Sequence, residues 1–192
     1  MSTAIINNEE FTANLYLDGR PLVINQYRLQ KIVRDPRITQ REKLDAEVGL
    51  ASLRLASFIT LADHEDHKPL LFRFVSQKDG YAISVVHSGK FGGARLFIED
   101  KTHNLLVSTD APLQHFSMST LGATKTSLSH IEAGPAYIEL CSEPKSKPMY
   151  RNISDGMSTF LDADPNLTTH NAFNNKPAQL VIKVIKASPS AA

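Results

Sequence analysis

Short apolar runs rich in Val, Ile, Tyr and Phe recur along this chain, and clusters of Gly, Pro, Asn and Asp separate them. Runs of this length and composition are typical of β-strands bounded by turns. A chain built from many such runs is expected to fold as an all-β sandwich or barrel. The runs predict twelve strands, at residues 14–17, 22–27, 53–61, 70–75, 81–87, 94–98, 105–108, 114–119, 137–141, 149–153, 158–161 and 179–185.

One segment departs from this pattern and predicts a helix. Asp35 and Pro36 are typical of a helix start, because Asp caps the first turn and Pro suits its first position. The residues that follow, up to Val48, are mostly good helix formers, and Gly49 is expected to end the helix. Along residues 53–61 the apolar positions alternate as in a strand. We therefore expect one helix of about three turns inserted into a β chain.

The length and composition fit a single globular domain. The chain has 192 residues, of which 42% are hydrophobic and 21% charged, within the usual globular range. Residues 1–12 are polar and aperiodic, and residues 187–192 are Ala, Ser and Pro. We expect flexible tails at 1–12 and 187–192 around one domain at 13–186. A chain of this size needs neither disulfides nor a metal to fold, and one cysteine permits no internal disulfide.

The charges nearly cancel, with 21 Lys and Arg against 20 Asp and Glu. Nucleic-acid binding is disfavoured, because phosphate contacts require clustered basic residues. The apolar stretch at residues 1–6 is too short for a signal-peptide core and lacks a positively charged start. Lys183 interrupts the late apolar run at 180–185, which is far below the roughly 20 residues of a membrane helix. We expect no membrane span, and a location in the cytoplasm or release without a classical signal peptide.

Three parts of the chain resemble one another. Residues 68–72, 111–116 and 176–181 each place a proline just before a strand with an apolar anchor. Thr102-His103-Asn104 and Thr169-His170-Asn171 precede the second and third of these segments and match identically. Strand openings at residues 15–17, 81–83 and 137–138 also recur. The repeats predict three unequal units of four strands each.

These anchors resemble the β-trefoil superfamily, in particular its ricin-B-like lectin branch, whose units each end in a Gln-x-Trp strand. Gln114-His115-Phe116 and Gln179-Leu180-Val181 look like degenerate versions of that motif, whereas residues 70–72 lack the Gln. Residues 79–83 and 87–91 are similar to the opening of a trefoil unit. The resemblance implies an all-β trefoil of three four-stranded units with one helical insertion in the first. An unrelated β-sandwich is the alternative.

The repeated Thr-His-Asn motif supplies the candidate ligand-binding residues. Asn offers both a donor and an acceptor to a sugar hydroxyl, and His can stack or form hydrogen bonds. The alternative is a structural role, in which Asn adopts a left-handed turn conformation and Thr supports the turn. The candidates are His103, Asn104, His170, Asn171 and the neighbouring aromatic Phe173.

Other conspicuous residues are expected to be structural. Tyr81, Phe91, Tyr150 and Phe160 lie among apolar residues with a period of two, which is typical of a core. Cys141 lies on an alternating strand and is expected to be a small buried hydrophobe.

One polar cluster and one glycine-rich segment contain residue types that can bind a metal ion or a phosphate. Residues 64–67 hold two His and two acids, which could ligate a metal, but a polar turn is preferred because no further ligand pair has suitable spacing. Residues 89–93 predict a hairpin turn and not a phosphate loop. We expect no metal site and no cofactor.

Two functions compete on this evidence. The first is a non-enzymatic, lectin-like carbohydrate-binding module, which the trefoil resemblance implies and the repeated Thr-His-Asn motif supports. The second is a protein-interaction β-trefoil, either a protease inhibitor or a component of a toxin or assembly. It would use residues 142–150, whose Pro and Lys content suits a rigid exposed loop. The expected partner is a glycan or a protein surface, and an enzyme is a third, less favoured reading.

Overall fold

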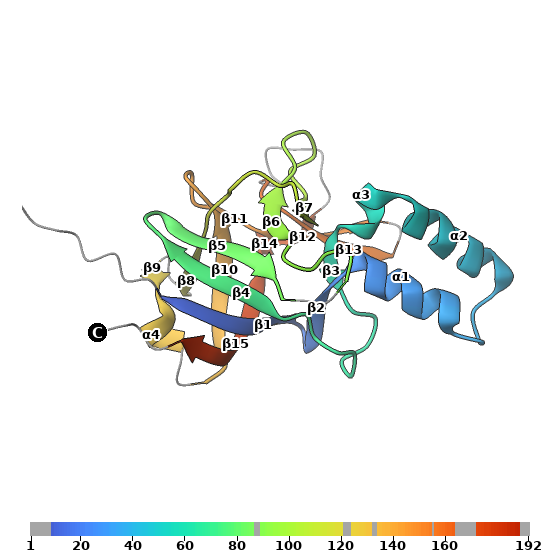
Figure 1. The fold of residues 1–192 in the computed structure, drawn as a ribbon, viewed down its shortest axis with the longest axis horizontal. Coiled ribbons are helices and arrows are strands. Elements are labelled where there is room, and N and C mark those ends of the chain that lie inside the picture. The colour runs from blue at the N-terminus through green and yellow to red at the C-terminus, as the bar shows by residue number, and fades with distance from the viewer. Residues whose placement is uncertain are drawn as a thin grey trace, which may run out of the picture.

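The computed structural model describes residues 9–86, 89–120, 124–131, 134–154, 156–163 and 172–188. Strands make up 47% and helices 19% of the structure, so the expectation of an all-β fold is confirmed. The strands form the body of the molecule, from which a pair of helices projects to one side (Figure 1). Each of the twelve predicted runs contains a strand, and the described residues hold three further strands.

Six antiparallel strands close into a barrel. β1 pairs with β15 on one side and with β4 on the other, and the ring continues through β5, β8 and β10 back to β15. Closure leaves none of these strands with a free edge along the ring. Their bounds are β1 (Glu10–Leu17), β4 (Phe72–Gln77), β5 (Gly80–Val85), β8 (Phe116–Thr120), β10 (Ala136–Ser142) and β15 (Gln179–Ser188).

Three strand pairs lie outside the ring and contact one another at isolated bridges, Phe58 with Leu106 and Asn104 with Leu161. Along the chain, each pair stands between two ring strands. The pairs are β2 (Arg20–Ile24) with β3 (Ile59–Leu61), β6 (Arg95–Ile98) with β7 (Leu105–Ser108), and β12 (Tyr150–Ser154) with β13 (Met157–Leu161). The remaining strands are β9 (Thr124–Thr126), β11 (Lys147–Pro148) and β14 (Ala172–Pro177).

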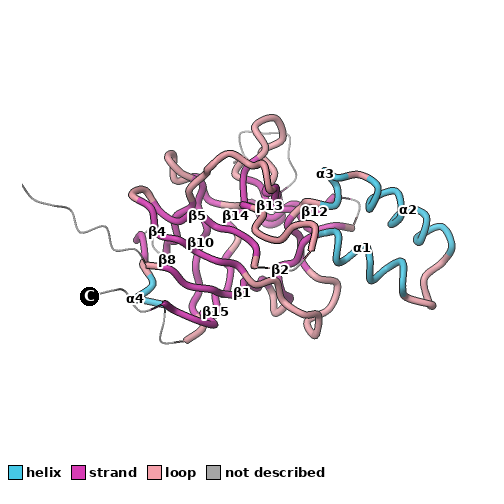
Figure 2. The backbone as a smooth tube through the Cα atoms, in the orientation of Figure 1, coloured by secondary structure: helices cyan, strands magenta, loops and turns pink. Residues whose placement is uncertain are grey.

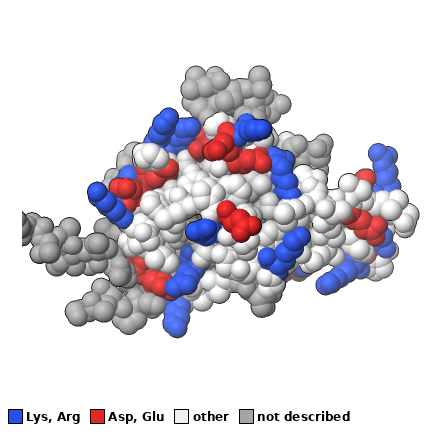
Figure 3. Space-filling view, turned by 45° about the horizontal axis from the view of Figure 1, so that its top comes forward, with Lys and Arg blue, Asp and Glu red and all other residues white. Residues whose placement is uncertain are grey.

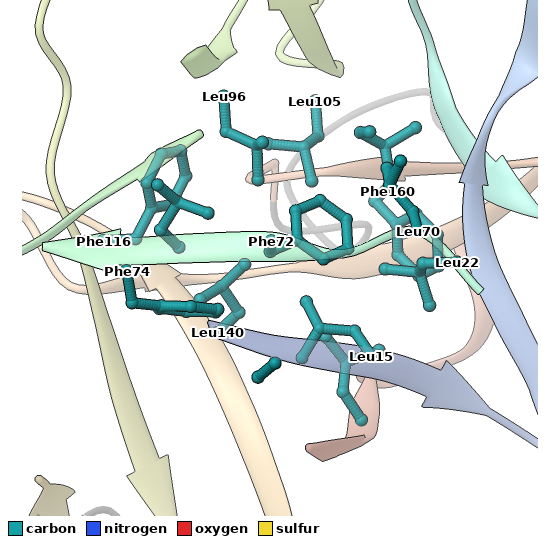
Figure 4. Close-up of a cluster of buried hydrophobic side chains, with 14 of the residues drawn as sticks. Leu15, Leu22, Leu70, Phe72, Phe74, Leu96, Leu105, Phe116, Leu140 and Phe160 are labelled. Atoms are coloured by element: carbon teal, nitrogen blue, oxygen red, sulfur yellow. The ribbon is translucent and has the colours of Figure 1, made fainter. Parts of the chain in front are cut away.

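One hydrophobic core contains side chains from the ring strands and from the outer strand pairs. Figure 4 shows Phe72, Leu15, Leu96 and Leu105 converging from different strands. The rings of Phe11 and Phe74 stack with centroids 4.7 Å apart. Alternation along β5 explains why every second side chain faces inward. Of the four aromatic residues expected in the core, three are buried and Tyr150 is partly buried; the buried three are Tyr81, Phe91 and Phe160.

The helical insertion lies between β2 and β3 and contains three helices, α1 (Asn25–Arg34), α2 (Gln40–Ala51) and α3 (Leu53–Ala56). A fourth short helix, α4 (Leu128–Ile131), follows β9. α1 and α2 lie side by side and extend away from the barrel (Figure 2). They approach closely at Gly49, where an added Cβ would lie 2.9 Å from Leu29 Cδ1. We call α1 and α2 the helical hairpin.

The predicted limits of the helix are wrong. Asp35 is the C-cap of α1, whereas the N-cap of α2 is Thr39, whose side chain forms a capping box with Glu42. Gly49 lies inside α2, because the helix continues to residue 51. Two of the predicted strands also contain helical residues, since 25–27 belong to α1 and 53–56 form α3.

The ends of the barrel strands differ from the expected domain limits. β1 begins at Glu10 and β15 ends at Ser188, so both strands extend into the segments expected to be tails. In the described part of the chain, no helix is both long and apolar enough to cross a membrane. Basic and acidic side chains are interspersed on the face shown in Figure 3.

Candidate functional site

The Thr102-His103-Asn104 motif forms the turn between β6 and β7. The Thr102 hydroxyl donates a hydrogen bond to the Glu99 carboxylate, and the His103 N–H donates to the Glu99 carbonyl oxygen at 2.8 Å. Thr therefore supports the turn, as the structural interpretation of the motif requires. The left-handed residue, however, is His103, with φ of 59°, and not Asn104. A non-glycine residue in this region is held there by its surroundings, and such positions cluster at functional sites.

A buried carboxylate joins His103 to the third repeat. Asp162 follows β13, and its Oδ1 lies 3.0 Å from His103 Nδ1. Its other oxygen accepts a 2.6 Å hydrogen bond from the Ser142 hydroxyl. The Asp162 N–H also donates to the His103 carbonyl oxygen at 3.1 Å. Because a carboxylate oxygen accepts hydrogen bonds, Nδ1 of His103 is the donor in this pair, and Nε2 has no hydrogen-bond partner among the described residues.

His103 and Asp162 line a pocket of about 370 Å³, which we call the His103 pocket. The His103 side chain is 39% exposed, whereas that of Asp162 is 7% exposed. The other walls come from the segment before β8, which includes the exposed Leu113, and from the turn between β10 and β11. Polar groups thus converge on a hollow that also has an apolar side.

Glu143 is the most strongly anchored acid of this pocket. Its carboxylate accepts hydrogen bonds from Ser117 Oγ at 2.6 Å, Lys125 Nζ at 2.8 Å and Ser146 Oγ at 3.0 Å. Burial raises the pKa of Glu143, but these hydrogen bonds and the charge of Lys125 outweigh it and hold the pKa below its usual value. Glu143 is therefore a fixed negative charge at neutral pH.

Residues 142–150 do not form the long exposed loop that the sequence predicts. β11 folds back on β10, with Cys141 opposite Pro148 and Ser142 opposite Lys147. Met149 is buried, and only the tip at residues 144–146 is exposed. The hairpin brings this segment into the same pocket as His103.

Of the two candidate residues whose side chains the structure describes, His103 lines this pocket and Asn104 does not. Asn104 pairs with Leu161 and lines a different, larger cleft. His170 and Asn171 lie outside the described residues, and Phe173 lies on β14, with its side chain likewise outside them. Asp162 could not be identified from the sequence, because it lies 59 positions from its partner His103.

The larger cleft has a volume of about 1020 Å³ and lies between the helical hairpin and the polar turn at residues 63–67. The rings of His64 and His67 meet edge to face in that turn, with centroids 5.3 Å apart. Within the described ranges, no three His, Cys, Asp or Glu side chains are grouped so as to hold a metal ion.

Cys141 is 6% exposed, which confirms the expected burial. Burial raises the pKa of its thiol above the usual value. Because the thiolate is the nucleophilic form, Cys141 is poorly suited to covalent chemistry.

Comparison with known proteins adds no family to this description. No protein-family model, curated protein or solved structure matches the chain. The chemistry of the two hollows is therefore the basis for a functional assignment.

Proposed function

We propose that the protein is a β-trefoil that binds carbohydrate without catalysis, at the His103 pocket. The order of the strands supports the trefoil. In each run of four, the first and last strands belong to the six-stranded ring and the middle two form an outer pair, as in β1, β2, β3 and β4. The same order recurs from β5 to β8 and from β10 to β15, apart from the additional strands β9, β11 and β14.

The observation that carries the carbohydrate proposal is the anchored His103–Asp162 pair beside exposed Leu113. A sugar hydroxyl both donates and accepts hydrogen bonds, so a site for it needs both kinds of partner. The exposed Asp100 supplies an acceptor, while His103 and Lys145 supply donors. Leu113, whose exposed fraction is 59%, offers an apolar surface to the C–H face of a sugar ring. The volume lies within the range of small-molecule sites.

The same contacts disfavour covalent catalysis. A serine nucleophile requires a base that takes its proton, usually a histidine within hydrogen-bond reach. Ser142 instead donates to Asp162, and it is only 3% exposed. His103 contacts the Asp162 carboxylate, and the Ser142 hydroxyl is bonded to the other oxygen of that carboxylate and not to His103. This geometry leaves the Ser142 hydroxyl without access to a substrate.

A glycan array with the wild type and the variant His103→Ala tests the proposal. We expect the wild type to bind at least one glycan, and the variant to bind it at least tenfold more weakly. His130→Ala is the matched control, because His130 is exposed on α4 and does not line the pocket. Circular dichroism checks that all three proteins are folded. Failure of the wild type to bind any glycan at high concentration, or equal binding by His103→Ala, contradicts the proposal.

A protein partner is the second candidate function, and the helical hairpin favours it. Leu44 and Val48 are 51% and 68% exposed, and their spacing of four places them on one face of α2. Leu53, nearby on α3, is 59% exposed. Apolar side chains gathered on a projecting element are typical of interaction surfaces.

Affinity capture from cell extract with the wild type and the double variant Leu44→Ser/Val48→Ser tests this second function. We expect a specific protein to be retained by the wild type and lost from the variant. Because both side chains are exposed, the free energy of unfolding should change by less than about 0.5 kcal/mol each. Equal capture by both proteins would rule out this face as the binding surface.

A further inference from the structure

The turn that presents His103 carries a second group of the His103 pocket. It runs from Glu99 to Asn104 between β6 and β7, and the exposed Asp100 lines the pocket together with His103. Asn104, at the end of the same turn, lines the larger cleft. The turn therefore contributes to both hollows, and its conformation sets the position of one donor and one acceptor that are available to a sugar.

The conformation of this turn depends on contacts of its own residues. The Glu99 N–H donates to the Asn104 carbonyl oxygen at 2.9 Å, and the His103 N–H donates to the Glu99 carbonyl oxygen. The Thr102 hydroxyl donates to the Glu99 carboxylate and accepts from the Asn104 N–H at 3.5 Å. The left-handed conformation of His103 is unfavourable for a residue other than glycine. Contacts of this kind are therefore needed to maintain it.

Arg54 contacts this turn from the helical insertion. It lies on α3, 45 positions before Glu99, and its Nε is 2.7 Å from Glu99 Oε1. Its Nη2 is 2.5 Å from Glu99 Oε2 and 3.3 Å from the Thr102 hydroxyl. A bidentate pair between a guanidinium and a carboxylate fixes the orientation of both groups. One guanidinium therefore contacts both of the side chains that hold the turn.

Arg54 is itself held against the turn. Its guanidinium carbon lies 5.0 Å from the centre of the Phe58 ring, which is a cation–π arrangement. Phe58 is buried and forms a bridge with Leu106 of β7. The hydrogen bonds from Arg54 lower the pKa of the Glu99 carboxyl to about 2, so both charges of the pair are present at neutral pH. The packing and the charge of Arg54 thus act at the same place.

We propose that Arg54 is a positioning residue of the His103 pocket, which through Glu99 and Thr102 holds the turn in the conformation that presents His103 to the ligand. Arg54 lines the larger cleft and not the pocket, so it does not contact the sugar itself. Asp162 holds His103 from the other side, at its ring Nδ1 and its carbonyl oxygen. This role rests on the carbohydrate proposal for its ligand, and it gives the helical insertion a part in sugar binding.

Long-range proton–nitrogen NMR of the histidine rings tests this role without a ligand. The His103 signals are assigned by their loss in His103→Ala. Because Nδ1 donates to Asp162, we expect the wild type to show the Nδ1-protonated tautomer at a pH at which the ring is neutral. In Arg54→Ala the turn should relax and the ring should separate from Asp162. The His103 signals should then shift toward the Nε2-protonated tautomer.

Glycan affinity provides the second measurement. The best glycan from the array should bind Arg54→Ala about fivefold more weakly than the wild type, which is the upper range for loss of one exposed ion pair. Arg73→Ala is the matched control, because Arg73 forms the same bidentate pair with Glu10, at 2.8 and 2.9 Å, and lines neither hollow. It should keep the tautomer and the affinity of the wild type.

Two variants of Thr102 test the same role should Arg54→Ala fail to fold, which circular dichroism checks. Thr102→Val removes the hydroxyl at nearly constant volume and should shift the His103 tautomer. Thr102→Ser keeps the hydroxyl and should resemble the wild type. Equal behaviour of these two variants overturns the proposal.

The proposal is also overturned if folded Arg54→Ala keeps the tautomer of the wild type, or if Arg73→Ala changes it equally. An unchanged affinity of Arg54→Ala for a glycan that the wild type binds overturns it as well. If the wild type binds no glycan, the carbohydrate proposal fails, but the tautomer signals still decide whether Arg54 positions His103. The two failures are thereby distinguished.

Discussion

Gly80, at the turn between β4 and β5, is a residue that no other amino acid can replace without strain. Its φ is 137°, and an added Cβ would lie 2.5 Å from the carbonyl oxygen of Phe116. That oxygen belongs to the backbone of a ring strand and cannot rotate away. We expect Gly80→Ala to lower the free energy of unfolding by about 2 to 4 kcal/mol, measured by urea denaturation followed by circular dichroism.

Gly93 provides the control for this prediction. Its φ of 72° is also left-handed, but no heavy atom lies within 4 Å of an added Cβ. Gly93→Ala should therefore show the conformational cost alone, about 1 kcal/mol. Equal losses in the two variants would mean that the contact with Phe116 has no energetic weight.

The candidate site could be predicted from the sequence only in part. His103 could be predicted as a site residue because its Thr-His-Asn motif occurs twice in the sequence. Asp162 and Ser142 are single residues with no repeated context, and their contact with each other and with His103 depends on how the outer strand pairs are brought together. The spacing of residues along the sequence does not indicate such contacts. The pocket could therefore be recognised only in the folded chain.

At the scale of elements, the start of α2 is fixed by Thr39. The Thr39 hydroxyl accepts from the Glu42 N–H at 3.3 Å, and the Glu42 carboxylate accepts from the Thr39 N–H at 2.9 Å. Loss of such a cap costs about 1 kcal/mol. We expect Thr39→Ala to accelerate amide hydrogen exchange in α2 about fivefold, measured by mass spectrometry.

Exchange in β1 should stay unchanged in this variant, because the helical hairpin projects from the barrel. Thr39→Ser keeps the hydroxyl and is expected to exchange like the wild type. If α2 exchanged equally in Thr39→Ala and Thr39→Ser, the capping box would not control the stability of the helix.

The start of α1 shows why element limits were harder to predict than elements. Its N-cap is Ile24, whose side chain makes no capping hydrogen bond. The apolar run of β2 passes into the helix without Gly, Pro or a polar cap to mark the change. The sequence at 22–27 therefore reads as one strand. Tertiary contacts decide the conformation there, including the hydrogen bond from Asn25 Nδ2 to Leu55.

At the scale of the whole molecule, the number of strands was predictable and their partners were not. Alternation of apolar and polar residues indicates that a strand has one buried face. Ring strands and strands of the outer pairs both have such a face. β5 alternates regularly, whereas β2 is buried at four consecutive positions. Neither pattern states which strand lies beside it. That β1 meets β15 follows from closure of the ring, which involves the chain as a whole.

The pairing of β1 with β15 has a consequence for the order in which the protein can be made. Glu10 lies opposite Ser188, and Tyr16 lies opposite Val181. As the chain leaves the ribosome, β1 can pair with β4 early, but its other edge stays open until residues 179–188 have been synthesised. Contacts between such distant segments form slowly, and an open edge is prone to pair with other chains. The barrel therefore closes only after β15 has emerged, and β1 is the ring strand whose second edge stays unpaired over the longest stretch of synthesis.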